Sequence, residues 1–175
     1  MVTRYIRAGF LCAALLLPVQ VSRAAPAPEP KPQPPVGIKL PDGRLTLFAG
    51  GASSATFIEP DSVARTDDTA VVMTYTVFEP PHAIAPGKIV VQAVNRHRID
   101  CAARTRQDLG SEGYDEAGKS LVWLPERPIE AIEPGSMYGF VVQIVCDKLE
   151  LPATNTVLGH VAARALAKQS LAAHR

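Results

Sequence analysis

Short apolar runs alternate with turn signals from Leu40 to about Leu124. The runs are rich in β-branched and aromatic residues, and clusters such as PDG, GG, EPD and GSEG separate them at intervals of about ten residues. This pattern predicts an antiparallel β-meander. The expected strands lie near residues 44–50, 54–59, 69–78, 88–94 and 120–125.

The segment 95–109, NRHRIDCAARTRQDL, continues with a period of two. If it is one strand, the alternation places Arg96, Arg98, Arg104 and Arg106 on a single water-facing side and points Cys101 inward. A strand of this length would span about 50 Å at about 3.3 Å per residue, so we expect a bend or bulge near residues 100–103.

The segment 133–150, EPGSMYGFVVQIVCDKLE, is apolar enough to be either a buried strand or a buried helix. Its small and polar residues recur at spacings of three and four, which is one stripe of a helix. They are Ser136, Gly139, Gln143, Asp147 and Glu150. We therefore expect a helix over about 136–148, with Ser136 as its N-cap and Cys146 in its last turn.

A second helix is expected after Pro152, capped by Thr154 or Asn155. Its apolar side is predicted to hold Leu158, Val161, Ala162, Ala165 and Leu166, with His160, Arg164 and Lys168 opposite. Because the segment 154–175 contains no acid, it fits a helix that lies on a membrane or a partner. The alternative is an alanine-rich extension that frays or docks loosely. The predicted fold class is thus α+β: an antiparallel meander, a helix on one face and a C-terminal helix.

The N-terminus has the features of a secretory signal peptide over residues 1–24. Arg4 and Arg7 precede an apolar run that is too short for a comfortable membrane span, and small residues precede a cleavage site after Ala24. A retained anchor is the alternative. The proline-rich residues 25–35 are expected to form an extended linker, or else a ligand for a proline-binding groove. Residues 36–150 then form the domain and residues 151–175 its C-terminal extension.

Cleavage would change the charge and the cysteine count. The formal charge moves from +1 to −2, because residues 1–24 contain three arginines and no acid. Two cysteines remain, Cys101 and Cys146, and an exported chain with two cysteines has one possible internal disulfide. Closing a loop of this length stabilises a fold by about 4 kcal/mol in the chain-entropy model. No transmembrane segment is expected after cleavage.

Candidate chemistry is sparse, and we expect no enzyme, no cofactor and no metal. His97 and Cys101 lie four strand positions apart, about 13 Å, which is too far for a thiol–imidazole pair. The histidines are dispersed and no zinc-like spacing occurs. The four arginines form either an anion- or heparin-binding surface or a solvated sheet face paired with acids. Overall acidity and export argue against nucleic acid.

The order of the motifs resembles the surface-adhesin protein E family. The similar phrases, over about Leu45 to Asp147, are ATFIEPDSV, IDCAARTRQ, GYDEAGKSLVW and IEAIEPGSM, followed by a helix that ends in VC. The resemblance implies an antiparallel sheet with a helix held against it by Cys101 and Cys146. It also implies a non-enzymatic bacterial surface protein that binds host matrix or serum proteins and can form a homodimer.

These observations predict an exported bacterial binding module of the periplasm or cell surface. Its expected partner is a host matrix protein or an envelope protein, contacted by Arg96, Arg98, Arg104 and Arg106. The alternative is a periplasmic structural or accessory protein without a host ligand.

Overall fold

The computed structural model describes residues 38–173. The chain divides into two compact units, Met1–Lys31 and Pro32–Arg175, and every described residue belongs to the second. The predicted signal peptide 1–24 and linker 25–35 lie outside the described residues and stay predictions, as does the division of the chain at residue 150.

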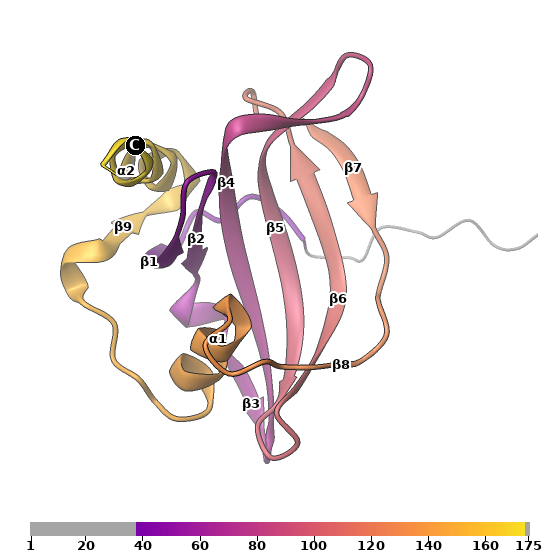
Figure 1. Ribbon diagram of the computed structural model, residues 1–175, viewed down its shortest axis with the longest axis vertical. Helices are drawn as coiled ribbons and strands as arrows, with labels where there is room; N and C mark the ends of the chain where they lie inside the picture. Colours follow the sequence, from indigo (N-terminus) through magenta and orange to yellow (C-terminus); the bar gives the residue numbers. More distant parts are fainter. Residues whose placement is uncertain (1–37, 174–175) are drawn as a thin grey trace, which may run out of the picture. The chain divides into compact units, whose positions relative to one another are not determined.

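The described residues form one antiparallel sheet of nine strands with two α-helices (Figure 1). The strands are β1 (Arg44–Gly50), β2 (Ser54–Ile58), β3 (Ala64–Thr66), β4 (Thr69–Ala85), β5 (Lys88–Asp100), β6 (Thr105–Tyr114), β7 (Ser120–Leu124), β8 (Glu130–Ala131) and β9 (Thr156–Leu158). The helices are α1 (Met137–Val145) and α2 (Gly159–Ala172), with short 3₁₀ turns at Pro60–Ser62 and Ala153–Asn155. The antiparallel sheet and both helices agree with the predicted fold class.

The strand order is β7-β6-β5-β4-β2-β1-β9, with β3 added to β4 and β8 to β6. Strand β4 lies near the centre because both of its faces are apolar, so it can be buried on each side. Val72 faces one side of the sheet and Tyr75 the other, and both are fully buried. At the end of the order, β9 pairs with β1, so the last strand of the chain is next to the first.

Each face of the sheet has its own core. Helix α1 packs Val141, Val142 and Val145 on one face, against a cluster that includes Val72 and Ile99. We call this the α1 face (Figure 1). Helix α2 packs on the opposite face over β1, β2 and β4, where Ala163, Ala167 and Leu171 join Leu45, Phe57 and Tyr75. We call that side the α2 face.

The segment 95–109 is not one strand. Strand β5 ends at Asp100, a turn covers Cys101–Arg104, and β6 returns beside β5. The expected bend near residues 100–103 is present, but it reverses the chain, because Arg104 adopts a positive φ of 52° and the Asp100 carboxylate accepts a hydrogen bond from the Ala103 amide at 2.8 Å. The predicted single face of alternating residues was therefore wrong.

Helix α1 begins where the sequence predicts. The Ser136 hydroxyl caps it by accepting a hydrogen bond from the Gly139 amide at 3.1 Å. Gly139 also lets the turn before the helix pack closely against the first turn of α1. A Cβ at Gly139 would lie 3.1 Å from the Glu133 carbonyl oxygen.

Helix α2 differs from its prediction in its start and its buried side. Asn155 belongs to a 3₁₀ turn and Thr156 pairs with Thr46 of β1, so the helix begins at Gly159, whose φ is +74°. The predicted apolar side was wrong, since Leu158 and Val161 are exposed. The expectation of loose docking was also wrong, because three α2 side chains are fully buried in the core.

Candidate functional site

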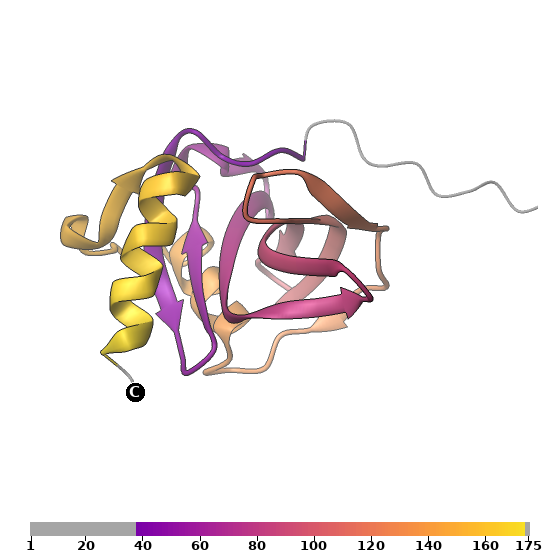
Figure 2. The same ribbon diagram turned by 90° about the horizontal axis from the view of Figure 1, so that it is seen from above.

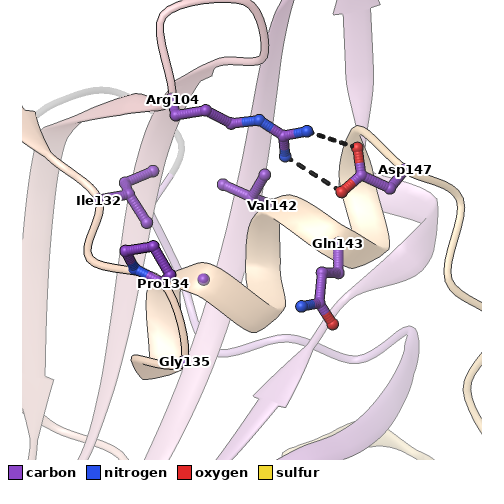
Figure 3. Close-up of a pocket in the computed structure, with 8 residues that line it drawn as sticks. Arg104, Ile132, Pro134, Gly135, Val142, Gln143 and Asp147 are labelled. Atoms are coloured by element: carbon purple, nitrogen blue, oxygen red, sulfur yellow. Dashed lines mark hydrogen bonds and ion pairs between the residues drawn. The ribbon is translucent and has the colours of Figure 1, made fainter.

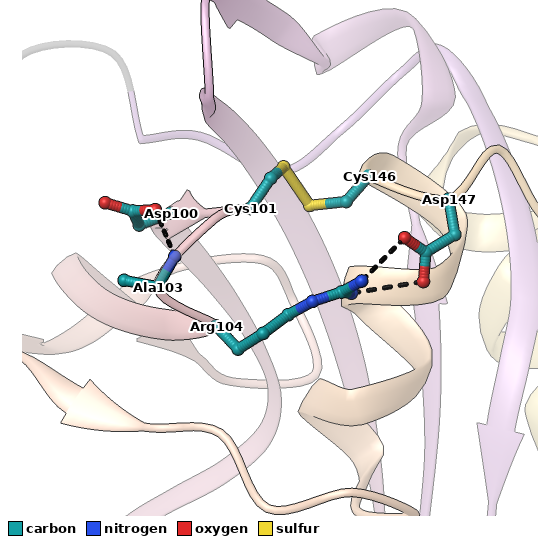
Figure 4. Close-up of a disulfide and its surroundings, with 6 residues drawn as sticks. All are labelled: Asp100, Cys101, Ala103, Arg104, Cys146 and Asp147. Carbon is teal, nitrogen blue, oxygen red and sulfur yellow. Dashed lines mark hydrogen bonds and ion pairs between the residues drawn. A yellow bond between two sulfur atoms is a disulfide. The ribbon is translucent and has the colours of Figure 1, made fainter.

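Helix α1 is fastened to the β5–β6 turn at its C-terminal end. The predicted disulfide joins Cys101 to Cys146, with their Cα atoms 5.5 Å apart (Figure 4). Beside it, Arg104 donates two hydrogen bonds to the Asp147 carboxylate, at 2.9 and 3.1 Å. These contacts join the same two segments, so the end of α1 is fixed by a covalent bond and an exposed ion pair.

A cavity of about 290 Å³ lies beside α1 (Figure 3). Its walls are the helix and the preceding segment 132–135, including Ile132, Pro134 and Val142. The Arg104 guanidinium at its rim points to Asp147 and not into the cavity. The groove thus offers apolar contacts and the Gln143 amide but no uncommitted charge.

A buried polar network lies between α1 and the sheet. The Thr74 hydroxyl and His97 Nε2 are 3.0 Å apart, and His97 Nδ1 is 2.8 Å from the Asp108 carboxylate. Arg106 donates to both Asp108 and Glu130. The hydrogen bond from His97 is the main cause that lowers the pKa of Asp108 to about 2; burial opposes it and Arg106 adds to it.

Tyr138 of α1 closes this network from above. Its ring lies edge-on to His97 at 5.1 Å between centroids, and the Arg106 guanidinium lies 3.8 Å from the centre of the same ring. Burial raises the pKa of the Tyr138 hydroxyl. The network therefore holds the N-terminal half of α1 against β5 and β6, while the disulfide holds the other end.

Thr74, His97 and Asp108 place a hydroxyl, an imidazole and a carboxylate in the order found in a nucleophilic triad. The hydroxyl and the imidazole are closed off from solvent. Only 2% of Thr74 and 1% of His97 is exposed, so no substrate reaches the hydroxyl and a catalytic role lacks access. Sequence reasoning missed the network because alternation along one continuous strand would put His97 on the inward side with Cys101 and Asp108 on the opposite side with the arginines. The available signal was an inward-facing histidine, which needs a polar partner when it is buried.

The four predicted contact arginines divide into two pairs on opposite faces. Arg104 is the last residue of the turn and pairs with Asp147, and Arg106 follows the turn in β6 and belongs to the network beneath α1. Arg96 and Arg98 precede the turn and share the α2 face with their β4 partners Met73 and Val71. The reversal at residues 101–104 causes this division, which replaces the predicted common surface.

The two arginines on the α2 face, Arg96 and Arg98, have no recorded ion pair with a carboxylate within residues 38–173. Arg98 donates to the Gln107 side chain at 2.9 Å, which is a neutral acceptor. Within residues 38–173, the structure records no hydrogen bond or ion pair for the side chain of Arg96. Arg96 and Arg98 lie two positions apart on β5 and on the same face of the sheet, so they form a cationic pair on the α2 face.

The far end of the α1 face is an open apolar trough of about 230 Å³, beyond the reach of α1. Its walls come from the β4–β5 hairpin and from β7, and they include Phe78, Ile84, Val90, Val122 and Leu124. The paired side chains of Asn95 and Ser111 lie at its floor. This surface supplies shape and apolar contact but little charge.

Two further features limit the chemistry of the described part of the chain. Residues 38–173 contain no group of three or more His, Cys, Asp or Glu side chains arranged to hold a metal ion. Over the same residues, neither helix combines the length and the apolar character that crossing a bilayer demands.

Comparison with known proteins gives one family and one set of solved structures. The family model described as surface-adhesin protein E matches residues 46–147. Crystal form II of Haemophilus influenzae protein E is 14% identical in sequence and matches with a TM-score of 0.48. The match covers 66% of the present chain and 94% of the protein E chain. A second structure, protein E from non-typeable Haemophilus influenzae, is 15% identical in sequence and matches with a TM-score of 0.43. The match covers 81% of the present chain and 91% of the protein E chain. No curated protein matches the chain.

Proposed function

Because the chain belongs to the surface-adhesin protein E family, we propose that it is an exported binding module that contacts a host matrix protein or another envelope protein. The family match runs from β1 to the residue after Cys146, and so includes both cysteines and the whole of α1. A disulfide is typical of proteins that fold in an oxidising compartment. The signal-like residues 1–24 support the same route.

The module is non-enzymatic. The one hydroxyl–imidazole–carboxylate arrangement recorded within residues 38–173 is covered by Tyr138 and inaccessible to a substrate. Its partners are the strands and helix around it, so its contribution is to stability. Binding therefore belongs to the exposed surface and not to this buried network.

Arg96 and Arg98 carry the contact with the partner. The observation behind this assignment is their freedom from carboxylates, whereas Arg104 and Arg106 already donate to acids within the molecule. Neighbouring guanidinium groups bind sulfate or carboxylate groups through paired hydrogen bonds. The partner's binding segment is thus anionic: an acidic stretch of a matrix protein or a sulfated chain attached to one.

The test compares two double variants of equal charge. Arg96→Gln/Arg98→Gln removes the proposed contact, and Arg65→Gln/Arg127→Gln removes two exposed arginines outside it. Binding to immobilised heparin and matrix protein is measured at low and high salt. We expect the first variant to bind at least about tenfold more weakly and the control to bind normally, because charged hydrogen bonds contribute about 1.5–3 kcal/mol each. Equal behaviour of the two variants, or no binding at low salt, removes the proposal.

Location is tested in native cells. Surface digestion with protease should cleave an adhesin while the outer membrane stays intact. Protection from the protease, together with release into the periplasmic fraction, would favour an accessory protein without a host ligand. Sedimentation of the purified chain tests the homodimer that the family resemblance implies, which would double the number of arginine pairs available to one partner.

A further inference from the structure

The side of helix α2 that faces away from the core carries exposed apolar residues together with a lysine and a glutamine. Its inward side buries Ala163, Ala167 and Leu171. Its outward side consists of six exposed residues: Leu158, just before the first turn, Val161, Ala165, Lys168, Gln169 and Ala172. We call these six residues the outer α2 stripe. The two largest, Leu158 and Val161, are 71% and 72% exposed, the highest values among the large apolar side chains described.

Such a stripe is unusual on a helix at the surface of a domain. The water-facing side of such a helix normally carries charged and polar residues, whereas Leu158 and Val161 are the most exposed large apolar side chains within residues 38–173. Figure 2 shows α2, in yellow, beside the part of the sheet that holds β1 and β2, which it contacts along one side. The depression along the stripe, between Val161, Ala165 and Lys168, is shallow, at about 220 Å³. It therefore offers a surface to lie on, not a groove that could hold a side chain.

The ionisable side chains of α2 itself are all basic, although Arg164 is paired with Glu116 of the β6–β7 turn. Residues 159–175 contain no acid. Lys168 lies in the stripe; Glu79 and Glu116 line a depression beside it, but within residues 38–173 no hydrogen bond or ion pair is recorded for the Lys168 side chain. Arg164 lies at its edge, where it donates to Glu116 at 2.6 Å, and the sequence continues to His174 and Arg175. A partner that complements the outer α2 stripe would therefore carry negative charge and offer an apolar region on a flat surface.

We propose that the outer α2 stripe docks on the surface of an anionic lipid bilayer. Exposed Leu and Val side chains beside lysine are the combination found on helices that lie in a membrane interface, with the apolar groups among the acyl chains and the cations at the headgroups. Leu158 and Val161 enter the interface, and Lys168 contacts lipid phosphates. This contact is weak and reversible, because one short stripe buries little area and each basic residue adds a modest attraction. It is separate from the binding of a partner by Arg96 and Arg98.

The experiment uses the chain from Ala25 to Arg175, which contains the whole second compact unit. Co-sedimentation is measured with vesicles of phosphatidylcholine alone and with vesicles containing phosphatidylglycerol. The expected result is binding to the anionic vesicles that weakens with salt. Leu158→Ser/Val161→Ser should reduce binding at least about tenfold, because two apolar side chains no longer enter the interface. Lys168→Gln should reduce it about fivefold.

Two controls keep the result specific. Leu124→Ser/Ile129→Ser removes two other exposed apolar side chains and should bind vesicles normally, as should Arg96→Gln/Arg98→Gln. Thermal unfolding of each variant confirms that it is folded. The proposal is overturned if the chain ignores anionic vesicles, or if the stripe and control variants bind alike. It is also overturned if the stripe variant loses only self-association or binding to a protein, because the face would then be a protein interface.

Discussion

Asp108 should stabilise the folded chain in a strongly pH-dependent manner. Its carboxylate accepts from His97 and Arg106 beneath α1, and its pKa is lowered from 3.8 to about 2. A depression of this size corresponds to about 2 kcal/mol of stability. Because the folded-state pKa is the lower one, this contribution is complete above about pH 5 and is lost as the pH falls through 3.8 toward the folded pKa of about 2.

Asp108→Asn tests this reasoning by urea unfolding at several pH values. At pH 7 we expect the variant to lose about 2 kcal/mol, and at pH 2 we expect the two unfolding curves to converge. The matched control is Asp147→Asn, which neutralises a carboxylate that also binds an arginine but is well exposed, so its effect should be small. A loss below about 0.5 kcal/mol at pH 7, or a difference that persists unchanged to pH 2, would refute the role of Asp108.

Two further predictions concern the disulfide and the sheet. Cys101→Ser/Cys146→Ser should lower the free energy of unfolding by about 4 kcal/mol, because the cysteines are 45 residues apart, and a reducing agent should bring the wild type to the same value. Unchanged unfolding by either route would contradict this. Gly113→Ala should cost about 1–3 kcal/mol, since its Cβ would lie 2.9 Å from Val122 and 3.2 Å from Val90. Gly51→Ala, where the added carbon meets open space, is the control, and equal losses would show that the contact is not tight.

Local patterns predicted the elements, whereas contacts between distant residues decided their arrangement. Residues 44–50 form the expected strand, and Ser136 caps the expected helix, because alternation and capping depend on neighbours in the chain. The start of α2 was misplaced because Thr156 pairs with Thr46, 110 residues away. No local signal reveals that pairing.

The candidate site shows the same limit. The period of two runs unbroken through residues 101–104, so it conceals a reversal that depends on the positive φ of Arg104. A further irregularity between Arg96 and His97 in the β5–β6 register changes which residues of β6 share a face. Between the turn and that irregularity the reversed chain pairs His97 directly with Asp108, so the two meet on the α1 face, although an uninterrupted strand would separate them. The buried face of α2 was ambiguous for another reason: alanines lie on every side of this helix.

The pairing of β1 with β9 has a consequence for the order of events during synthesis. A ribosome makes β1 more than a hundred residues before its outer neighbour, so the backbone groups of that edge stay unpaired until the last part of the chain has appeared. Helix α2, which covers the same edge, follows later still. The growing chain therefore exposes a strand able to pair with foreign strands for most of its synthesis, and a chain stopped before residue 156 should aggregate rather than accumulate as a folded fragment.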